Sequence, residues 1–133
     1  MKNLFVLSCT LLIGISVFSC KDDDYETIDS TEKIKIDSVL VPYDTMYVNK
    51  VQNIKTFSTY ATTCNGFFGY DYIHTGSFSR DVTAYQYTSN GNCTIYNHQN
   101  ASILKFSPNQ TGTYTLRFWK GDNNWITKTI VVQ

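Results

Sequence analysis

The strongest constraint on the fold of this chain is the alternation of apolar and polar residues along its second half. In residues 114–118, Tyr, Leu and Phe alternate with Thr and Arg, and residues 126–132 follow a similar pattern. Successive side chains of a strand point to opposite faces of a sheet, so this period indicates half-buried β-strands. No segment shows a sustained helical period, and the abundant Thr, Tyr, Val, Ile and Phe favour strands. The sequence therefore predicts an all-β protein.

Turn-forming residues separate the predicted strands at short intervals. Asn65-Gly66, Thr75-Gly76 and the run at 89–92 carry residues that tolerate positive φ or preset a turn. We expect strands at residues 34–41, 47–60, 67–74, 79–87, 93–97, 101–106, 113–119 and 125–132. Because two of these are expected to merge or one to be absent, the prediction is an antiparallel β-sandwich of about seven strands.

Residues 111–116, Thr-Gly-Thr-Tyr-Thr-Leu, resemble the tyrosine corner of immunoglobulin-like domains. In that motif a glycine, here Gly112, lets the chain bend, and the tyrosine hydroxyl, here that of Tyr114, bonds back to the backbone. Leu116 stands where antibody domains have a Cys, so the usual bridge between the two sheets is absent. The resemblance implies a single immunoglobulin-like sandwich, which we place at residues 33–133.

The first 19 residues have the composition of a bacterial lipoprotein signal peptide. Lys2 supplies the positive charge, and residues 4–18 form an apolar stretch shorter than the ~20 residues that span a bilayer. Small residues precede Cys20, the expected site of cleavage and of acylation by diacylglycerol and a palmitate-type chain. Several acyl chains would anchor the protein permanently, at ~0.8 kcal/mol per buried methylene. The alternative is an ordinary secretory leader in which Cys20 is incidental.

Cys20 is followed by Lys21, Asp22, Asp23 and Asp24. This run resembles the start of surface lipoproteins from Bacteroidota-type bacteria, in which a Lys and acidic residues after the lipidated Cys act as an export signal. The resemblance implies a protein of the outer membrane that is exposed at the cell surface. The alternative is a solvated tether that only keeps the domain away from a membrane.

Charge divides the mature chain into two regions. Residues 21–32 hold one Lys and six acids, which predicts a disordered acidic linker that, with Cys20, covers residues 20–32. Residues 33–133 hold nine Lys and Arg against five acids, spread too evenly for a nucleic-acid face. These 101 residues suffice for one domain.

The cysteines predict one disulfide. Of the four, one lies in the leader and Cys20 carries lipid, which leaves Cys64 and Cys93. An exported chain meets an oxidising compartment, so we expect these two to be bonded, with their loops at one end of the sandwich. A metal site would need more ligands than this pair and the scattered His74 and His98 provide, so we expect no metal and no cofactor.

A wider resemblance covers about three quarters of the chain. The spacing of Cys-Asn-Gly-Phe, Gly-Asn-Cys-Thr, Phe-Ser-Pro, Gly-Thr-Tyr-Thr-Leu-Arg-Phe-Trp and a terminal Thr-Ile-Val-Val resembles small uncharacterised Bacteroidota lipoproteins with one Ig-like domain. This resemblance implies a fold and a location, and no activity.

Catalytic motifs are weak in this sequence. His74 and His98 lie in different predicted segments, and no nucleophile stands at a spacing that indicates a triad. Asp71 and Asp81 could form the carboxylate pair of a glycosidase. Isolated carboxylates on strands and loops are, however, more often solvated than catalytic. We therefore expect a protein that is not an enzyme.

Binding is the function that the sequence favours. Loops at 65–70, 89–92 and 120–125 are expected at one end of the sandwich, with Phe67, Phe68, Tyr70 and Trp125 among Asn, Asp and Gly. Such aromatic faces suit a glycan or a protein ligand, whereas the alternative is that they alternate inward as core. Phe67 and Phe68 are adjacent, so one of them should be exposed. The leading prediction is a binding or adhesion module, and the alternative is a structural subunit of an envelope complex.

Overall fold

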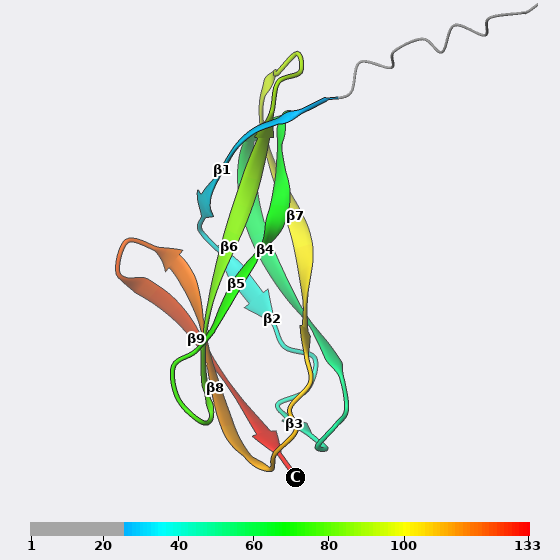
Figure 1. The fold of residues 1–133 in the computed structure, drawn as a ribbon, viewed down its shortest axis with the longest axis vertical. Coiled ribbons are helices and arrows are strands. Elements are labelled where there is room, and N and C mark those ends of the chain that lie inside the picture. Colours follow the sequence, from blue (N-terminus) through cyan, green and yellow to red (C-terminus); the bar gives the residue numbers. More distant parts are fainter. Residues whose placement is uncertain (1–25) are drawn as a thin grey trace, which may run out of the picture.

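The computed structural model describes residues 26–133, so the predicted signal peptide, the lipidation site Cys20 and the export signal Lys21 to Asp24 lie outside the described residues. Two β-sheets pack face to face in an elongated molecule (Figure 1). The strands are β1 Ile28–Ile34, β2 Ser38–Leu40, β3 Thr45–Met46, β4 Gln52–Thr62, β5 Asn65–His74, β6 Ser79–Ser89, β7 Ile95–Phe106, β8 Gly112–Gly121 and β9 Asn124–Val132. The predicted all-β sandwich is confirmed.

The larger sheet has six strands and is organised around β6. Its order is β1-β6-β8-β9-β3, with β5 also paired to β6, while the smaller sheet has the order β2-β4-β7. β5 pairs with β6 over most of its length, so β8 and β1 share the opposite edge. β8 pairs with Ser79 to Val82 of β6, and β1 pairs with Ala84 to Ser89.

Two pairings of the predicted antiparallel sandwich are parallel in the structure. β6 and β8 are parallel, and so are β3 and β9. The first pairing arises because β7, which connects β6 to β8, lies in the smaller sheet. The chain therefore returns through the other layer and enters β8 in the direction of β6.

Three of the predicted strands have other boundaries in the structure. The predicted strand at 34–41 is divided between β1 and β2, because the chain passes from one sheet to the other near Asp37, whose amide donates to the carbonyl of Phe57. The predicted strands at 93–97 and 101–106 merge into β7, which pairs with β4 along its length.

The predicted disordered linker at 20–32 is wrong at its end. β1 begins at Ile28 and pairs with β6 from Ile28 opposite Ser89 to Ile34 opposite Ala84. Six of its seven residues are exposed, so the strand is held by backbone hydrogen bonds. Because it has no alternation of apolar residues, the sequence did not indicate it. The sandwich therefore begins before residue 33.

The core lies between the sheets and follows the alternation seen in the sequence. On β8 the side chains of Tyr114, Leu116 and Phe118 are buried between exposed or half-buried neighbours. The largest fully buried side chains are Tyr60, Tyr114, Phe118, Ile36, Ile54, Leu116, Ile130, Val82 and Thr56.

The predicted tyrosine corner is present at the start of β8. The hydroxyl of Tyr114 donates to the carbonyl of Gln110 at 3.2 Å. Gly112 has a φ of +150°, and a Cβ there would stand 2.6 Å from the ring of Phe78. That ring in turn packs edge-on against Tyr114, with 5.1 Å between centroids. A glycine is therefore required where the chain enters β8.

The predicted disulfide between Cys64 and Cys93 is also confirmed, with 5.2 Å between the two Cα atoms. Cys64 lies in the β4–β5 turn and Cys93 in the β6–β7 loop, at the top of Figure 1. The amide of Ser89 donates to the carbonyl of Cys64, so the end of β6 is tied to the same turn. We call this the disulfide end of the molecule.

Two buried tyrosines give a matched test of this packing. We expect Tyr114→Phe to lower the unfolding free energy by about 1 kcal/mol, because it removes the hydrogen bond to Gln110. Tyr60→Phe should leave it unchanged or raise it by up to about 1 kcal/mol, because the buried Tyr60 hydroxyl makes no hydrogen bond of good geometry among residues 26–133 and has only a weak interaction with the Ser102 side chain. Urea denaturation of both variants checks the pair, and equal losses would contradict the assignment.

Candidate functional site

Of the three loops that the sequence predicted at one end, the start of 65–70 and the run at 89–92 meet at the disulfide end, whereas the loop at 120–125 lies elsewhere. The β8–β9 turn lies partway along the molecule, away from the disulfide end (Figure 1). The amide of Ile36 donates to the carbonyl of Trp119, and Gly121 lies beside Lys35. The reason is that β8 pairs with only the first half of β6, since β1 occupies the second half.

The four predicted ligand-loop aromatics accordingly have different environments. Phe67 packs against the core, with its ring centroid 4.7 Å from that of Tyr70, and the Tyr70 hydroxyl bonds to that of Thr56 at 2.6 Å. Phe68 is 56% exposed, because a bulge interrupts the β5–β6 register between Phe67 and Gly69. Phe68 is thus the exposed member of the adjacent pair.

Trp125 belongs to a different surface, the outer face of the larger sheet. It lies opposite Trp119 in the β8–β9 ladder. The guanidinium of Arg117 lies 4.8 Å from the ring centroid of Trp125, and the ammonium of Lys33 lies 5.9 Å from that of Trp119. One face of each indole is therefore covered by a cation from the chain itself.

A hollow lies between the two sheets, toward the end opposite the disulfide. It has a volume of about 350 Å³ and is bounded by the ends of β5 and β7 and by residues 107–109 of the following loop. We call it the Arg80 cleft, because Arg80 of β6 lines it together with Tyr72, His74, Lys105 and Tyr114. A second hollow of about 310 Å³ is lined by Thr31, Phe68 and Tyr85.

Arg80 is a charged residue at an inward-facing position. It is 8% exposed, and its Nη1 donates to the carbonyls of Gly76, Ser77 and Ser79 at 2.9, 3.3 and 2.8 Å. Its guanidinium carbon lies 5.4 Å from the ring centroid of Tyr114. The carbonyls of the β5–β6 turn and the Tyr114 ring therefore hold this side chain in one orientation.

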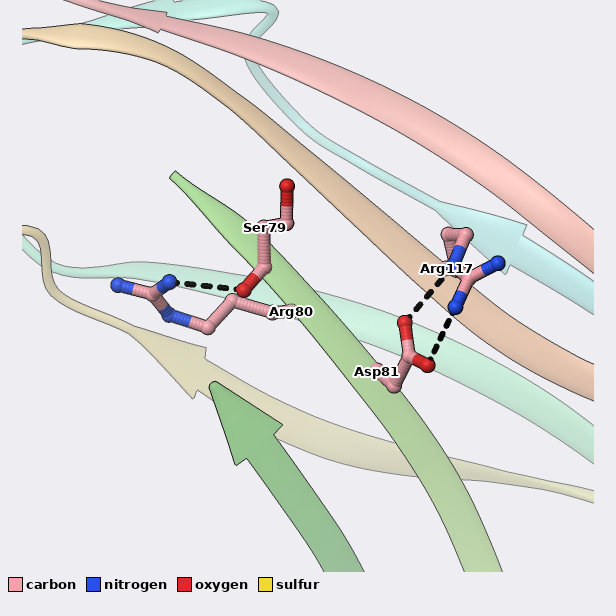
Figure 2. A network of polar contacts seen from close by, with 4 residues as sticks. All are labelled: Ser79, Arg80, Asp81 and Arg117. Carbon is pink, nitrogen blue, oxygen red and sulfur yellow. Dashed lines mark hydrogen bonds and ion pairs between the residues drawn. The ribbon is translucent and has the colours of Figure 1, made fainter. Parts of the chain in front are cut away.

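The side chain of Asp81, the next residue, points away from that of Arg80 and toward Arg117 (Figure 2). Its two carboxylate oxygens accept from Nε and Nη2 of Arg117 at 2.8 and 2.6 Å on the outer face. These hydrogen bonds raise the pKa of the exposed Arg117. Among residues 26–133 the Arg117 pair is the one ion pair present, so Arg80 has no carboxylate partner there.

Tyr72 and His74 form one wall of the Arg80 cleft. Their rings meet edge-on with 5.5 Å between centroids. Burial raises the pKa of the Tyr72 hydroxyl, and the charge of Arg80 opposes part of that rise. The phenol therefore stays neutral at physiological pH and is available as a hydrogen-bond donor beside the guanidinium.

The other residues considered for chemistry are dispersed. His74 lines the cleft, whereas His98 of β7 stacks on Tyr60 and Tyr96 at centroid distances of 5.5 and 5.6 Å. Asp71 is exposed on β5. Among residues 26–133 no three His, Cys, Asp or Glu side chains gather in a way that would hold a metal ion. The same range contains no helix of the length and apolar character needed to cross a bilayer.

Comparison of the chain with protein-family models, with curated proteins and with solved structures gives no match. The resemblance to Bacteroidota lipoproteins therefore stays a prediction from the residues quoted above.

Arg80 was missed by the sequence analysis, although a signal was present. Val82 and Ala84 are buried on the inner face of β6, and the period of two places Arg80 on that same face. A cation in an inward register is uncommon unless it has partners, so its position alone was informative. The other residues of the cleft could not be identified from the sequence, because β5, β7 and the loop at 107–109 meet only in the folded chain.

The raised tyrosine pKa values predict a stability limit at alkaline pH. Burial raises the pKa of Tyr60, Tyr70 and Tyr72 above the ordinary 10.0, so the unfolded chain loses these protons before the folded one. The unfolding free energy should therefore be constant just below pH 10 and fall as pH rises through the folded-state pKa values. Urea denaturation across this range should show a shallower fall for Tyr72→Phe. The exposed control Tyr43→Phe should follow the parent, and an equal profile for all three would contradict the prediction.

Proposed function

We propose that this chain is a lipid-anchored, non-enzymatic binding module of the outer membrane that is exposed at the cell surface and takes its ligand in the Arg80 cleft. The observation that carries this proposal is the position of the cleft relative to the start of the sandwich. β1 enters at Ile28, opposite Ser89, whereas Arg80 lies at the other end of β6. At ~3.3 Å per residue these two ends of β6 are about 30 Å apart.

An anchor at Cys20 fits this geometry. Seven residues lie between Cys20 and Ile28 along the chain, and the eight steps from one Cα to the other can span at most about 28 Å. A tether of that length holds the disulfide end closest to the membrane surface. The cleft then opens near the far end of the molecule, where a ligand from outside can reach it.

The cleft itself has the properties of a small-ligand site. Its volume of about 350 Å³ lies at the lower end of the usual range for such sites. Aromatic rings and an oriented cation meet polar groups of the loop at 107–109. These groups suit recognition, and the carboxylate Asp81 is engaged by Arg117 on the other face.

A second candidate is a structural subunit of an envelope complex, and one observation favours it. On the outer face of the smaller sheet, Leu40 and Ile103 both lie in register with Lys55, and Phe57 lies in register with Ala101. Leu40 and Ile103 are exposed, so this face carries apolar side chains that a partner could cover.

The anchor and the location are tested together. We expect a protease added to intact cells to remove the protein, because the surface prediction places the sandwich outside the outer membrane. Cys20→Ser should move it from the membrane fraction to the soluble fraction, whereas the nearby Ser19→Ala should not. Immunoblots of shaved and fractionated cells check both results against a periplasmic marker. Protection until lysis would contradict surface exposure.

The binding site is tested by filling the cleft. Cells that display the protein are screened against arrays of glycans and proteins, and each ligand found is tested on two variants. Asn109→Trp should weaken binding at least about tenfold by occupying the mouth of the cleft. Asn97→Trp, a matched change on an exposed position of β7 that does not line the cleft, should leave it unchanged. Equal binding by both variants would place the site elsewhere, and the apolar face of the smaller sheet would then be the next to test.

A further inference from the structure

We infer that the Arg80 cleft recognises a carboxylate group on a small ligand, with the guanidinium of Arg80 as its partner; this inference rests on the proposed binding function. The cleft would take a ligand of about one sugar ring or one amino-acid residue that carries a single negative charge. Three features of the described residues support this assignment: the free edge of the guanidinium, the charge of the lining and the shape of the walls.

The guanidinium is fixed by one of its nitrogens only. The side-chain hydrogen bonds of Arg80 start from Nη1 and end on the carbonyls of Gly76 and Ser77 in the β5–β6 turn and of Ser79 at the start of β6. The edge formed by Nε and Nη2 is the one that Arg117 uses to bind Asp81. On Arg80 that same edge makes no hydrogen bond of good geometry to the described residues, and the neighbouring Tyr72 hydroxyl, whose burial-raised pKa the guanidinium partly lowers, is the polar side chain close enough to interact with it. Because a guanidinium edge matches the spacing of two carboxylate oxygens, it is suited to a bidentate contact.

The charge of the lining is one-sided. Lys105 lines the cleft with Arg80, and no Asp or Glu is among the lining residues. A cation that is 8% exposed loses most of its hydration, and carbonyl dipoles and one aromatic ring return only part of it. An anion at the free edge of Arg80 would supply the missing counter-charge in a site with little water, where such contacts are strong.

The walls select a small ligand with both apolar and polar surface. Tyr72 and Tyr114 contribute ring faces and edges, while Ser107 and Asn109 contribute polar groups at the mouth. Arg80 is held in place before the ligand arrives, so little side-chain entropy is lost on binding. A carboxylate of this size occurs in two sources, a sugar acid and the free C-terminus of a peptide, and the experiment distinguishes them.

The test uses the full chain purified in detergent and calorimetric titration with matched pairs of probes. The sugar arm compares glucuronate with glucose, and the peptide arm compares an acetylated dipeptide that has a free C-terminus with its amide. We expect the charged member of at least one pair to bind at least about tenfold more tightly than its neutral partner. The arm that shows the difference identifies the source. Inorganic phosphate serves as a third probe, and tighter binding of phosphate than of both carboxylates would overturn the carboxylate assignment.

Variants locate the contact. Arg80→Gln should abolish the preference for the charged probe, Arg80→Lys should keep the charge but lose most of the affinity, and Lys105→Gln should weaken binding to a smaller extent. Arg117→Gln is the matched control, because it removes the other arginine from the outer face and should leave the titration unchanged. Circular dichroism melts establish which variants fold.

The outcomes separate this inference from the proposed function. Unchanged binding in a folded Arg80→Gln variant, or equal affinity for charged and neutral probes, would overturn the carboxylate inference and leave a binding module with another ligand. Absence of binding by every probe would also overturn it, while the display screen with Asn109→Trp still decides the proposed function. If Arg80→Gln does not fold, the matched probes on the parent chain and the Lys105→Gln variant still give the answer.

Discussion

The rest of this structure depends on the pairing of β6 with three neighbours. β5 runs along one of its edges, and β8 and β1 divide the other edge between them. That division stops β8 halfway along β6 and sends the β8–β9 turn to the side of the molecule. It also gives the exposed residues of β1 a place in the sheet, since their backbone groups complete the edge that β8 leaves open.

The same strand separates two arginine environments. On the outer face Asp81 holds Arg117, and on the other side of the strand Arg80 donates to the carbonyl of Ser79 (Figure 2). The ring of Tyr114 also packs against the Arg80 guanidinium. The exposed ion pair contributes little to stability, because solvent screens it. Burial of Arg80 costs free energy that the described residues offset only in part. Because Arg117 has a carboxylate partner and Arg80 has none among residues 26–133, this difference points to a ligand at Arg80.

Besides Arg80, several tyrosine hydroxyls are buried in this fold, and they differ in whether they have a hydrogen-bond partner. The hydroxyl of Tyr60 is buried without a hydrogen bond of good geometry among residues 26–133, and the Tyr70 hydroxyl is satisfied by Thr56 of the facing sheet. Tyr114 is satisfied within its own corner by Gln110. A sandwich of this size has a small core, so each unsatisfied group takes a noticeable share of its stability.

Local patterns in the sequence determined the all-β class, the buried faces of β8 and β9, the tyrosine corner and the Cys64–Cys93 pair, because each depends on residues close in sequence or on counting. Tertiary structure alone decided the parallel pairing of β6 with β8, the inclusion of β1 and the composition of the Arg80 cleft. These depend on which strands compete for the edges of β6, and that competition is settled by backbone hydrogen bonds, which carry no sequence pattern. A single inward cation on β6 was visible in the sequence, but only the fold showed which groups surround it.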